Sequence, residues 1–309
     1  HSDVAMFAPF AFLLVWRLVR ERKITDTIWL TIVLYLMLIA GMPTFAAYFL
    51  YLLGVWIVIL TIYRYRMNIR KILIVFCEFG SSVVMAGLIS FPYTAQLLLS
   101  VGSNGYTDSR KNQGFDTLET FYLSLSYYPD WTQELARHFN ECTFYIGMLG
   151  LILLLCTFIR LHKRKNIWYW AGAAVVLLLF IYTHTLDFIY TRLPAINTSN
   201  KFRVMVLLNF TIAILSGFHL DDLIENREYY KKRWYLMLPA VLIVLGGWIY
   251  FSELELRALS ETLTDTKIIT LCYILASALC LILYAKWGRK EILVILCIVT
   301  VLDLGGFAS

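Results

Sequence analysis

The stretch that decides the fold is LPAINTSNKFRVMVLLNFTIAILSGF, residues Leu193–Phe218. It begins as a polar, turn-rich loop that ends in two cations, Lys201 and Arg203. The apolar run that follows is long enough to cross most of a bilayer as a helix, and no other Lys or Arg occurs before Arg227. Ser199 suits the helix N-cap, because its hydroxyl can accept hydrogen bonds from the first free amides. We therefore expect a membrane helix that begins at the membrane surface.

The two cations beside this helix N-terminus form a candidate anion site, because the free amides and the helix dipole also favour negative charge. The alternative is that Lys201 and Arg203 only anchor the helix among the lipid headgroups. Residues two positions apart in an α-helix are about 200° apart around its axis. Either Lys201 lies in the capping turn, or Arg203 alone contacts the anion.

The composition of the whole chain is that of a membrane protein. Of the 309 residues, 60% are hydrophobic and 16% are charged, whereas soluble domains contain about 25% charged residues. We expect an all-α polytopic integral membrane protein in which residues 1–309 form a single transmembrane helical domain. The chain begins with His1 and ends at Ser309 inside an apolar segment, so we expect a fragment that lacks both ends.

About ten apolar segments are predicted to cross the membrane as helices. They are residues 4–19, 25–41, 44–63, 72–92, 142–159, 167–183, 204–219, 234–251, 268–285 and 292–308. The second and third segments are predicted to form a tight hairpin through Gly41, Met42 and Pro43, because proline there prevents the helix from continuing.

The cations predict the orientation. Short loops on one side hold 19 of the 27 Lys and Arg residues, and longer loops on the other side hold 8. Cytoplasmic loops are enriched in Lys and Arg, so the first set faces the cytoplasm and His1 and Ser309 both lie outside. The net charge of +6 is mostly this topology signal and gives no indication of nucleic acid as a partner.

Three long loops are predicted on the outer side, at about residues 101–141, 184–203 and 252–267. The first contains Arg110 and a group of polar and aromatic residues that includes Tyr127, Tyr128 and Asp130. Aromatic rings mixed with hydroxyls and a carboxylate suit sugar binding, and they equally suit an aromatic belt at the membrane interface. The second loop contains His184 and Asp187.

Two carboxylates lie at membrane depth, where ionisable residues are functional candidates. Glu78 is on the cytoplasmic side, and Ser81 and Ser82 are on the same helix face as possible hydroxyl partners of its carboxyl group. We interpret Glu78 as a packing residue. Asp303 lies in the outer half of the last segment, and both a functional and a structural role remain open for it. The sequence identifies no cofactor or metal site, since it contains no CxxC, Walker, GxGxxG, GxSxG or HExxH pattern.

Several motifs follow one another along nearly the whole chain: Ala40-Gly41-Met42-Pro43, the stretch from Pro92 to Arg110, Tyr145-Ile146-Gly147, Leu193-Pro194, Phe202-Arg203 and the acidic pair Asp221-Asp222. In this order they resemble the bacterial YfhO-type membrane proteins, relatives of the GT-C glycosyltransferases. The resemblance implies a GT-C-like fold in the cytoplasmic (inner) membrane of a bacterium and a further outer domain after the last segment.

The resemblance also implies a function: transfer of a sugar from a polyprenyl-phosphate donor to a cell-envelope polymer on the outer face. We expect membrane lipids, this donor and this acceptor as partners. The resemblance places the catalytic base of GT-C enzymes in the first outer loop, and we expect this fragment to begin beyond that loop. The residues expected to act are Arg203, Lys201 and Arg110 on the donor phosphate; Tyr127, Tyr128 and His184 on the sugar or acceptor; and Asp3, Asp130 or Asp187 as a carboxylate base.

The alternative is a polytopic transporter or lipid-handling protein without catalysis, with Glu78 and Asp303 along its path. The predicted segments show no clear inverted repeat and no paired broken helices, which does not favour a transporter.

Overall fold

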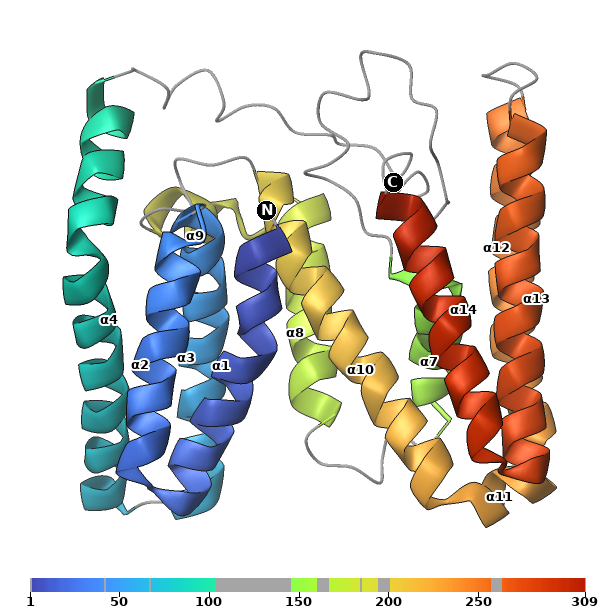
Figure 1. Cartoon of the computed structure of the whole chain (residues 1–309), viewed down its shortest axis with the longest axis horizontal. Helices are drawn as coiled ribbons and strands as arrows, with labels where there is room; N and C mark the ends of the chain where they lie inside the picture. Colours follow the sequence, from blue (N-terminus) through green and yellow to red (C-terminus); the bar gives the residue numbers. More distant parts are fainter. Residues whose placement is uncertain are drawn as a thin grey trace. The chain divides into compact units, whose positions relative to one another are not determined.

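The computed structural model describes residues 2–41, 43–66, 68–103, 146–159, 167–183, 185–193, 201–256 and 263–308. Over these ranges the regular elements are α-helices and short 3-10 turns, with no β-strand (Figure 1). The predicted all-α class is therefore confirmed. The chain divides into two compact units. Unit 1 comprises His1–Gly114 and Thr185–Leu207, and unit 2 comprises Phe115–His184 and Leu208–Ser309. The expectation of a single domain stays a prediction.

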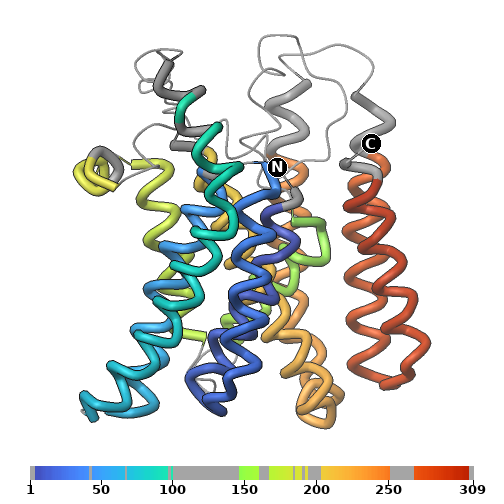
Figure 2. The backbone as a smooth tube through the Cα atoms, turned by 60° about the vertical axis from the view of Figure 1, so that its left-hand side comes forward, coloured from blue at the N-terminus to red at the C-terminus, as the bar shows by residue number. Residues whose placement is uncertain are grey.

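Unit 1 is a group of long helices with two short elements from the later part of the chain. Its elements are α1 (Ser2–Glu21), α2 (Ile24–Ile39), α3 (Pro43–Tyr65), α4 (Ile69–Ser103), α9 (Asp187–Arg192) and the 3-10 turn η2 (Lys201–Val204). Helix α2 packs against both α1 and α4, and α1 also packs against α3. The tube in Figure 2 shows α1, α2, α3 and α4 running up and down in alternation.

The predicted hairpin between the second and third segments is confirmed. Helix α2 ends at Ile39, and α3 begins at Pro43. Gly41 has a φ of +94°, a left-handed conformation that glycine adopts without a steric penalty. Proline suits the first position of α3, because the amide it lacks would have no partner within the helix.

At the end of unit 1 opposite the α2–α3 hairpin, side chains join the helices to one another. Arg17 Nη2 lies 3.0 Å from Asp26 Oδ1, and the Asp26 side chain is 1% exposed. The Tyr65 hydroxyl donates a hydrogen bond of 2.7 Å to the Val19 carbonyl. These contacts join α1 to α2 and α3 to α1, so part of the basic segment that the charge count assigned to the cytoplasm also holds the unit together.

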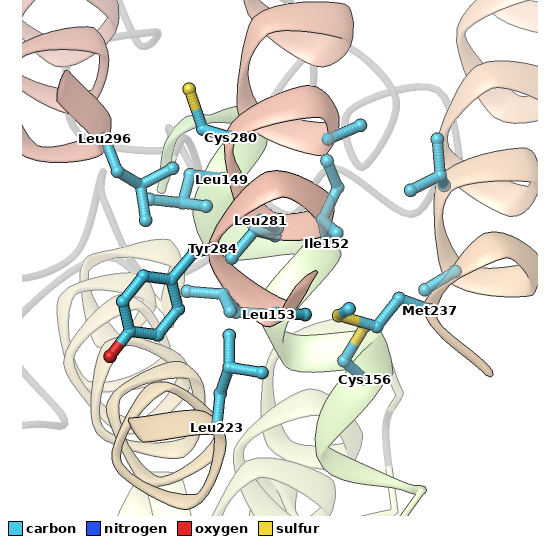
Figure 3. Close-up of a cluster of buried hydrophobic side chains, with 14 of the residues drawn as sticks. Leu149, Ile152, Leu153, Cys156, Leu223, Met237, Cys280, Leu281, Tyr284 and Leu296 are labelled. Atoms are coloured by element: carbon cyan, nitrogen blue, oxygen red, sulfur yellow. The ribbon is translucent and has the colours of Figure 1, made fainter. Parts of the chain in front are cut away.

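Unit 2 contains the remaining helices. They are α7 (Gly147–Thr157), α8 (Ile167–Tyr182), α10 (Met205–Glu225, whose first three residues belong to unit 1), α11 (Arg227–Lys232), the 3-10 turn η3 (Trp234–Met237), α12 (Leu238–Leu256), α13 (Leu263–Trp287) and α14 (Lys290–Ala308). Its buried cluster draws Ile152 from α7, Leu223 from α10, Leu281 from α13 and Leu296 from α14 (Figure 3). Close packing of this kind, rather than the hydrophobic effect, is what associates helices within lipid.

Two interhelical hydrogen bonds accompany this packing in unit 2. The Ser216 hydroxyl donates to the Gly150 carbonyl at 2.8 Å, and the Thr157 hydroxyl donates to the Leu215 carbonyl at 3.1 Å. Both bonds join α7 to α10. Hydroxyl side chains commonly link membrane helices in this way, because the donor has no water to bind in the bilayer.

Each of the ten predicted segments coincides with a helix in the described residues. Four helical segments are long and apolar enough to cross a membrane: Thr44–Tyr65, Ile69–Gln96, Met205–Glu225 and Ile268–Trp287. Apolar side chains such as Leu73, Val84 and Leu88 on α4 are exposed, as lipid-facing residues would be. The structure therefore supports a membrane protein, and ten crossings remain a prediction.

Two predicted boundary regions differ from the structure, and a third lies outside the described ranges. Helix α4 continues past Pro92 to Ser103, because a proline removes one helical hydrogen bond without having to end a membrane helix. Helices α12 and α13 cover residues 252–256 and 263–267, so most of the third predicted loop is helical. Residues 142–145, predicted to begin the fifth segment, lie outside the described ranges.

Candidate functional site

The predicted anion site lies at the entry to α10. Lys201 and Arg203 both belong to the 3-10 turn η2, and the regular helix begins at Met205. Residues two apart in a 3-10 helix are separated by about 240°, so the α-helical angle expected from the sequence does not apply. Arg203 is half-buried, and η2 packs against α3. The proposed cap Ser199 and the Lys201 side chain lie outside the described structure.

Other predicted site residues belong to unit 1. Asp187 is the first residue of α9 and is half-buried. Asp3 lies in the first turn of α1, and its side chain is not described. Figures 1 and 2 both place α9 at the end of unit 1 where α1 begins. The chain therefore brings the backbone of both aspartates to one end of this unit. The other predicted site residues, Arg110, Tyr127, Tyr128, Asp130 and His184, lie outside the described ranges.

Glu78 has a partner that the sequence did not reveal. Its Oε1 atom accepts a hydrogen bond of 3.3 Å from Arg22 Nη2 in the α1–α2 turn. The expected partnership of its carboxyl group with Ser81 and Ser82 is wrong, since both hydroxyls donate to the Glu78 backbone carbonyl, at 2.8 and 3.2 Å. Serine hydroxyls within a helix commonly bond to a carbonyl one turn earlier. The ion pair joins α4 to the α1–α2 turn, which is a structural role.

Asp303 binds the first turn of another helix. Its Oδ2 atom accepts a 2.8 Å hydrogen bond from the Met148 amide, and its side chain is fully buried. Met148 is the second residue of α7, where the helix's own carbonyls offer the amide no partner. The Asp303 carboxyl group on α14 thus acts as the N-cap of α7. Gly147, before it, has a φ of +78°.

The second aspartate of the acidic pair, Asp222, is buried in a polar cluster. It accepts hydrogen bonds from the Tyr230 hydroxyl at 2.6 Å and from Asn226 Nδ2 at 2.9 Å. The His219 ring packs edge-on against Tyr230, with ring centroids 5.6 Å apart. Sequence analysis missed this cluster, although the spacing of Asp222 and Asn226 by one helical turn was a signal. The cluster joins the end of α10 to α11.

Replacing Tyr230 with phenylalanine should destabilise the protein by about 1.5–3 kcal/mol, because a buried carboxylate loses a hydrogen-bond donor. The measurement is the midpoint of thermal unfolding in detergent. Tyr235→Phe is the matched control, since Tyr235 is exposed. Equal midpoints for the two variants would show that the bond to Asp222 contributes nothing to stability.

No group of three His, Cys, Asp or Glu residues in the described part of the chain is arranged to hold a metal ion. The polar groups that the structure does bring together are the half-buried Arg203 at the entry to α10, the Asp303 cap and the Asp222 cluster. Asp303 and Asp222 accept hydrogen bonds from protein donors, whereas Arg203 is the described cation at the predicted anion site.

Comparison with known proteins identifies the family of the chain. No curated protein matches it, and no solved structure matches it. The model of one protein family, described as bacterial membrane protein YfhO, matches residues 1–309. The match covers every motif, from Ala40-Gly41-Met42-Pro43 to Asp221-Asp222, and the chain therefore belongs to the YfhO family of bacterial membrane proteins.

Proposed function

We propose that this protein is a membrane glycosyltransferase of the GT-C type. It would transfer a sugar from a polyprenyl-phosphate donor to a cell-envelope acceptor on the outer face of the bacterial cytoplasmic membrane. The observation that carries the proposal is the position of Arg203, half-buried in the turn that leads into α10, in a chain that belongs to the YfhO family.

The chemistry of the donor fits this position. A lipid phosphate at the membrane surface requires cations at headgroup level, and a guanidinium group can bind two of its oxygens at once. The same contact stabilises the phosphate as it leaves the sugar and gains negative charge. In the proposal Arg203 makes this contact, assisted by Lys201 and Arg110.

The acceptor hydroxyl must lose its proton as it attacks the sugar, which requires a general base. A carboxylate on the outer side is suited to this role, and Asp3, Asp130 and Asp187 are the proposed bases. Tyr127, Tyr128 and His184 are proposed to contact the sugar or the acceptor through ring faces and polar atoms.

The test uses a radiolabelled polyprenyl-phosphate sugar and the purified full-length protein in liposomes that contain an envelope polymer as acceptor. Label that moves to the acceptor supports a transferase. Label that crosses the bilayer without transfer supports the alternative, a lipid-handling transporter. A preparation that does neither, although it is folded, contradicts the proposed function.

The orientation has its own expected result. In a variant whose native cysteines are replaced by serine, Gly105→Cys should react with an impermeant thiol reagent added to intact cells. Lys163→Cys should react only after the cells are opened, because the charge count places its loop in the cytoplasm. The reverse pattern of labelling would invert the topology and remove Arg203 from the outer face.

A further inference from the structure

A basic cavity lies at one end of unit 2. Its volume is about 420 Å³, and the residues that line it are Arg227, Lys231, Lys286, Trp287 and Arg289. Four of these five carry a positive charge. The charge count of the loops assigns this end to the cytoplasm, so the cavity is separate from the proposed outer site and does not depend on the proposed function.

The cavity is built by two turns that are distant in the sequence. Arg227 begins α11 and packs against the turn between α13 and α14. Its Nη2 atom donates a 3.4 Å hydrogen bond to the Lys286 carbonyl. Gly288 has a φ of +64°, and a Cβ atom there would overlap the Arg227 guanidinium group. Glycine at this position therefore allows the turn and leaves room for the arginine.

Little negative charge offsets these cations. Lys231 lies 3.9 Å from Glu228, an exposed pair one helical turn apart that contributes little. Within the described residues, no carboxylate lies within ion-pair distance of Arg227, Lys286 or Arg289. The Lys286 ammonium group lies over the Trp234 ring, 4.1 Å from its centroid. This cation–π contact holds the ammonium group in position but does not neutralise its positive charge.

The Arg227 Nε atom does not itself contribute to the cavity. It is buried and has no hydrogen-bond partner in the described structure, and it lies against Gly288. An atom without accessible surface cannot contact an anion, so the four cations that line the cavity carry the case for a ligand.

We propose that this cavity binds a phosphate group at the cytoplasmic surface of the membrane. Arg227 and Arg289 offer planar guanidinium groups that can each hold two phosphate oxygens, and Lys231 and Lys286 add point charges. The exposed Trp287 ring, at the end of α13, is the type of residue found at the level of lipid headgroups. The phosphate belongs either to an anionic phospholipid or to a soluble phosphate compound, and both have the same binding chemistry.

The experiment measures equilibrium binding of a fluorescent short-chain phosphatidylglycerol to the full chain in a zwitterionic detergent. Arg227→Gln and Arg289→Gln should each weaken binding about fivefold, the effect of one cation near an anionic surface. Arg289 is exposed and lacks a described protein partner, so its replacement should not disturb folding. Arg64→Gln and Arg70→Gln are matched controls, because both remove an exposed cation from another basic segment.

Competition distinguishes the two sources of phosphate. If inorganic phosphate or pyrophosphate displaces the probe, the site takes a soluble phosphate; if only unlabelled phosphatidylglycerol does, the site takes a headgroup. Equal weakening in the cavity variants and the controls would mean general attraction to a basic surface and would overturn the proposal. So would unchanged binding in both cavity variants, or displacement by phosphatidylcholine as effective as by phosphatidylglycerol.

Discussion

Replacing Arg203 with lysine is expected to lower the affinity for a polyprenyl-phosphate donor at least about tenfold, and to lower turnover as well. A lysine ammonium group supplies charge but cannot bind two phosphate oxygens in a plane. Loss of such a contact in a partly buried site typically costs about 2 kcal/mol or more. The measurement is donor binding and sugar transfer by the purified full-length protein, with folding checked separately by its thermal midpoint.

Two control variants make this result specific. Arg64→Lys makes the same chemical change at an exposed arginine of the predicted cytoplasmic side. Glu78→Gln removes a carboxylate whose described partner is Arg22, and it should preserve transfer. Lys201→Gln should have a smaller effect than Arg203→Lys. If Arg203→Lys binds and transfers like the unmodified protein, Arg203 is only a headgroup anchor and the proposed donor site is wrong.

Replacing Asp303 with alanine is expected to destabilise unit 2 by about 1–3 kcal/mol, because the buried Met148 amide then has no acceptor. Gly147→Ala should have a comparable effect. Gly147 is held at a φ of +78°, where a residue with a Cβ pays about 1–2 kcal/mol. The new methyl group would also lie 3.0 Å from Asp303 Oδ2. Thermal unfolding in detergent measures both losses.

The chain offers matched controls for this prediction. Gly305 lies on the same helix as Asp303, and a Cβ there would meet nothing within 4 Å, so Gly305→Ala should not lower the midpoint, since alanine favours a helix more than glycine does. Asp303→Asn keeps an oxygen that can accept the Met148 hydrogen bond, so it should lose less stability than Asp303→Ala. A normal midpoint for Asp303→Ala would show that the cap is not needed for stability and would return Asp303 to the list of functional candidates.

The sequence determined the features that depend on neighbouring residues. The apolar segments gave the positions of the helices, because a run of apolar side chains favours a helix in lipid whatever packs against it. Gly41 and Pro43 determined the hairpin, since the φ preference of each residue is local. The ordered motifs also identified the YfhO family, which the match over residues 1–309 confirms.

Some details of the candidate site were not determined locally. The 3-10 turn at Lys201 and Arg203 replaced the expected regular helix start, although both residues lie where the sequence predicted the entry to α10. The turn packs against α3, which precedes it in the chain by more than a hundred residues. A capping pattern such as Ser199 indicates that a helix begins, but it does not specify the shape of the first turn.

Only the tertiary structure decided which polar residues meet. Glu78 binds Arg22 across 56 residues of sequence, and Asp303 caps Met148 across 155. The Arg227 guanidinium group lies against Gly288, and no local sequence pattern connects the two turns that hold these residues. Helical periodicity relates residues only a few positions apart, whereas these pairs depend on which helices pack together and at what height. The sequence placed each of these groups on its helix or turn, and packing chose its partner.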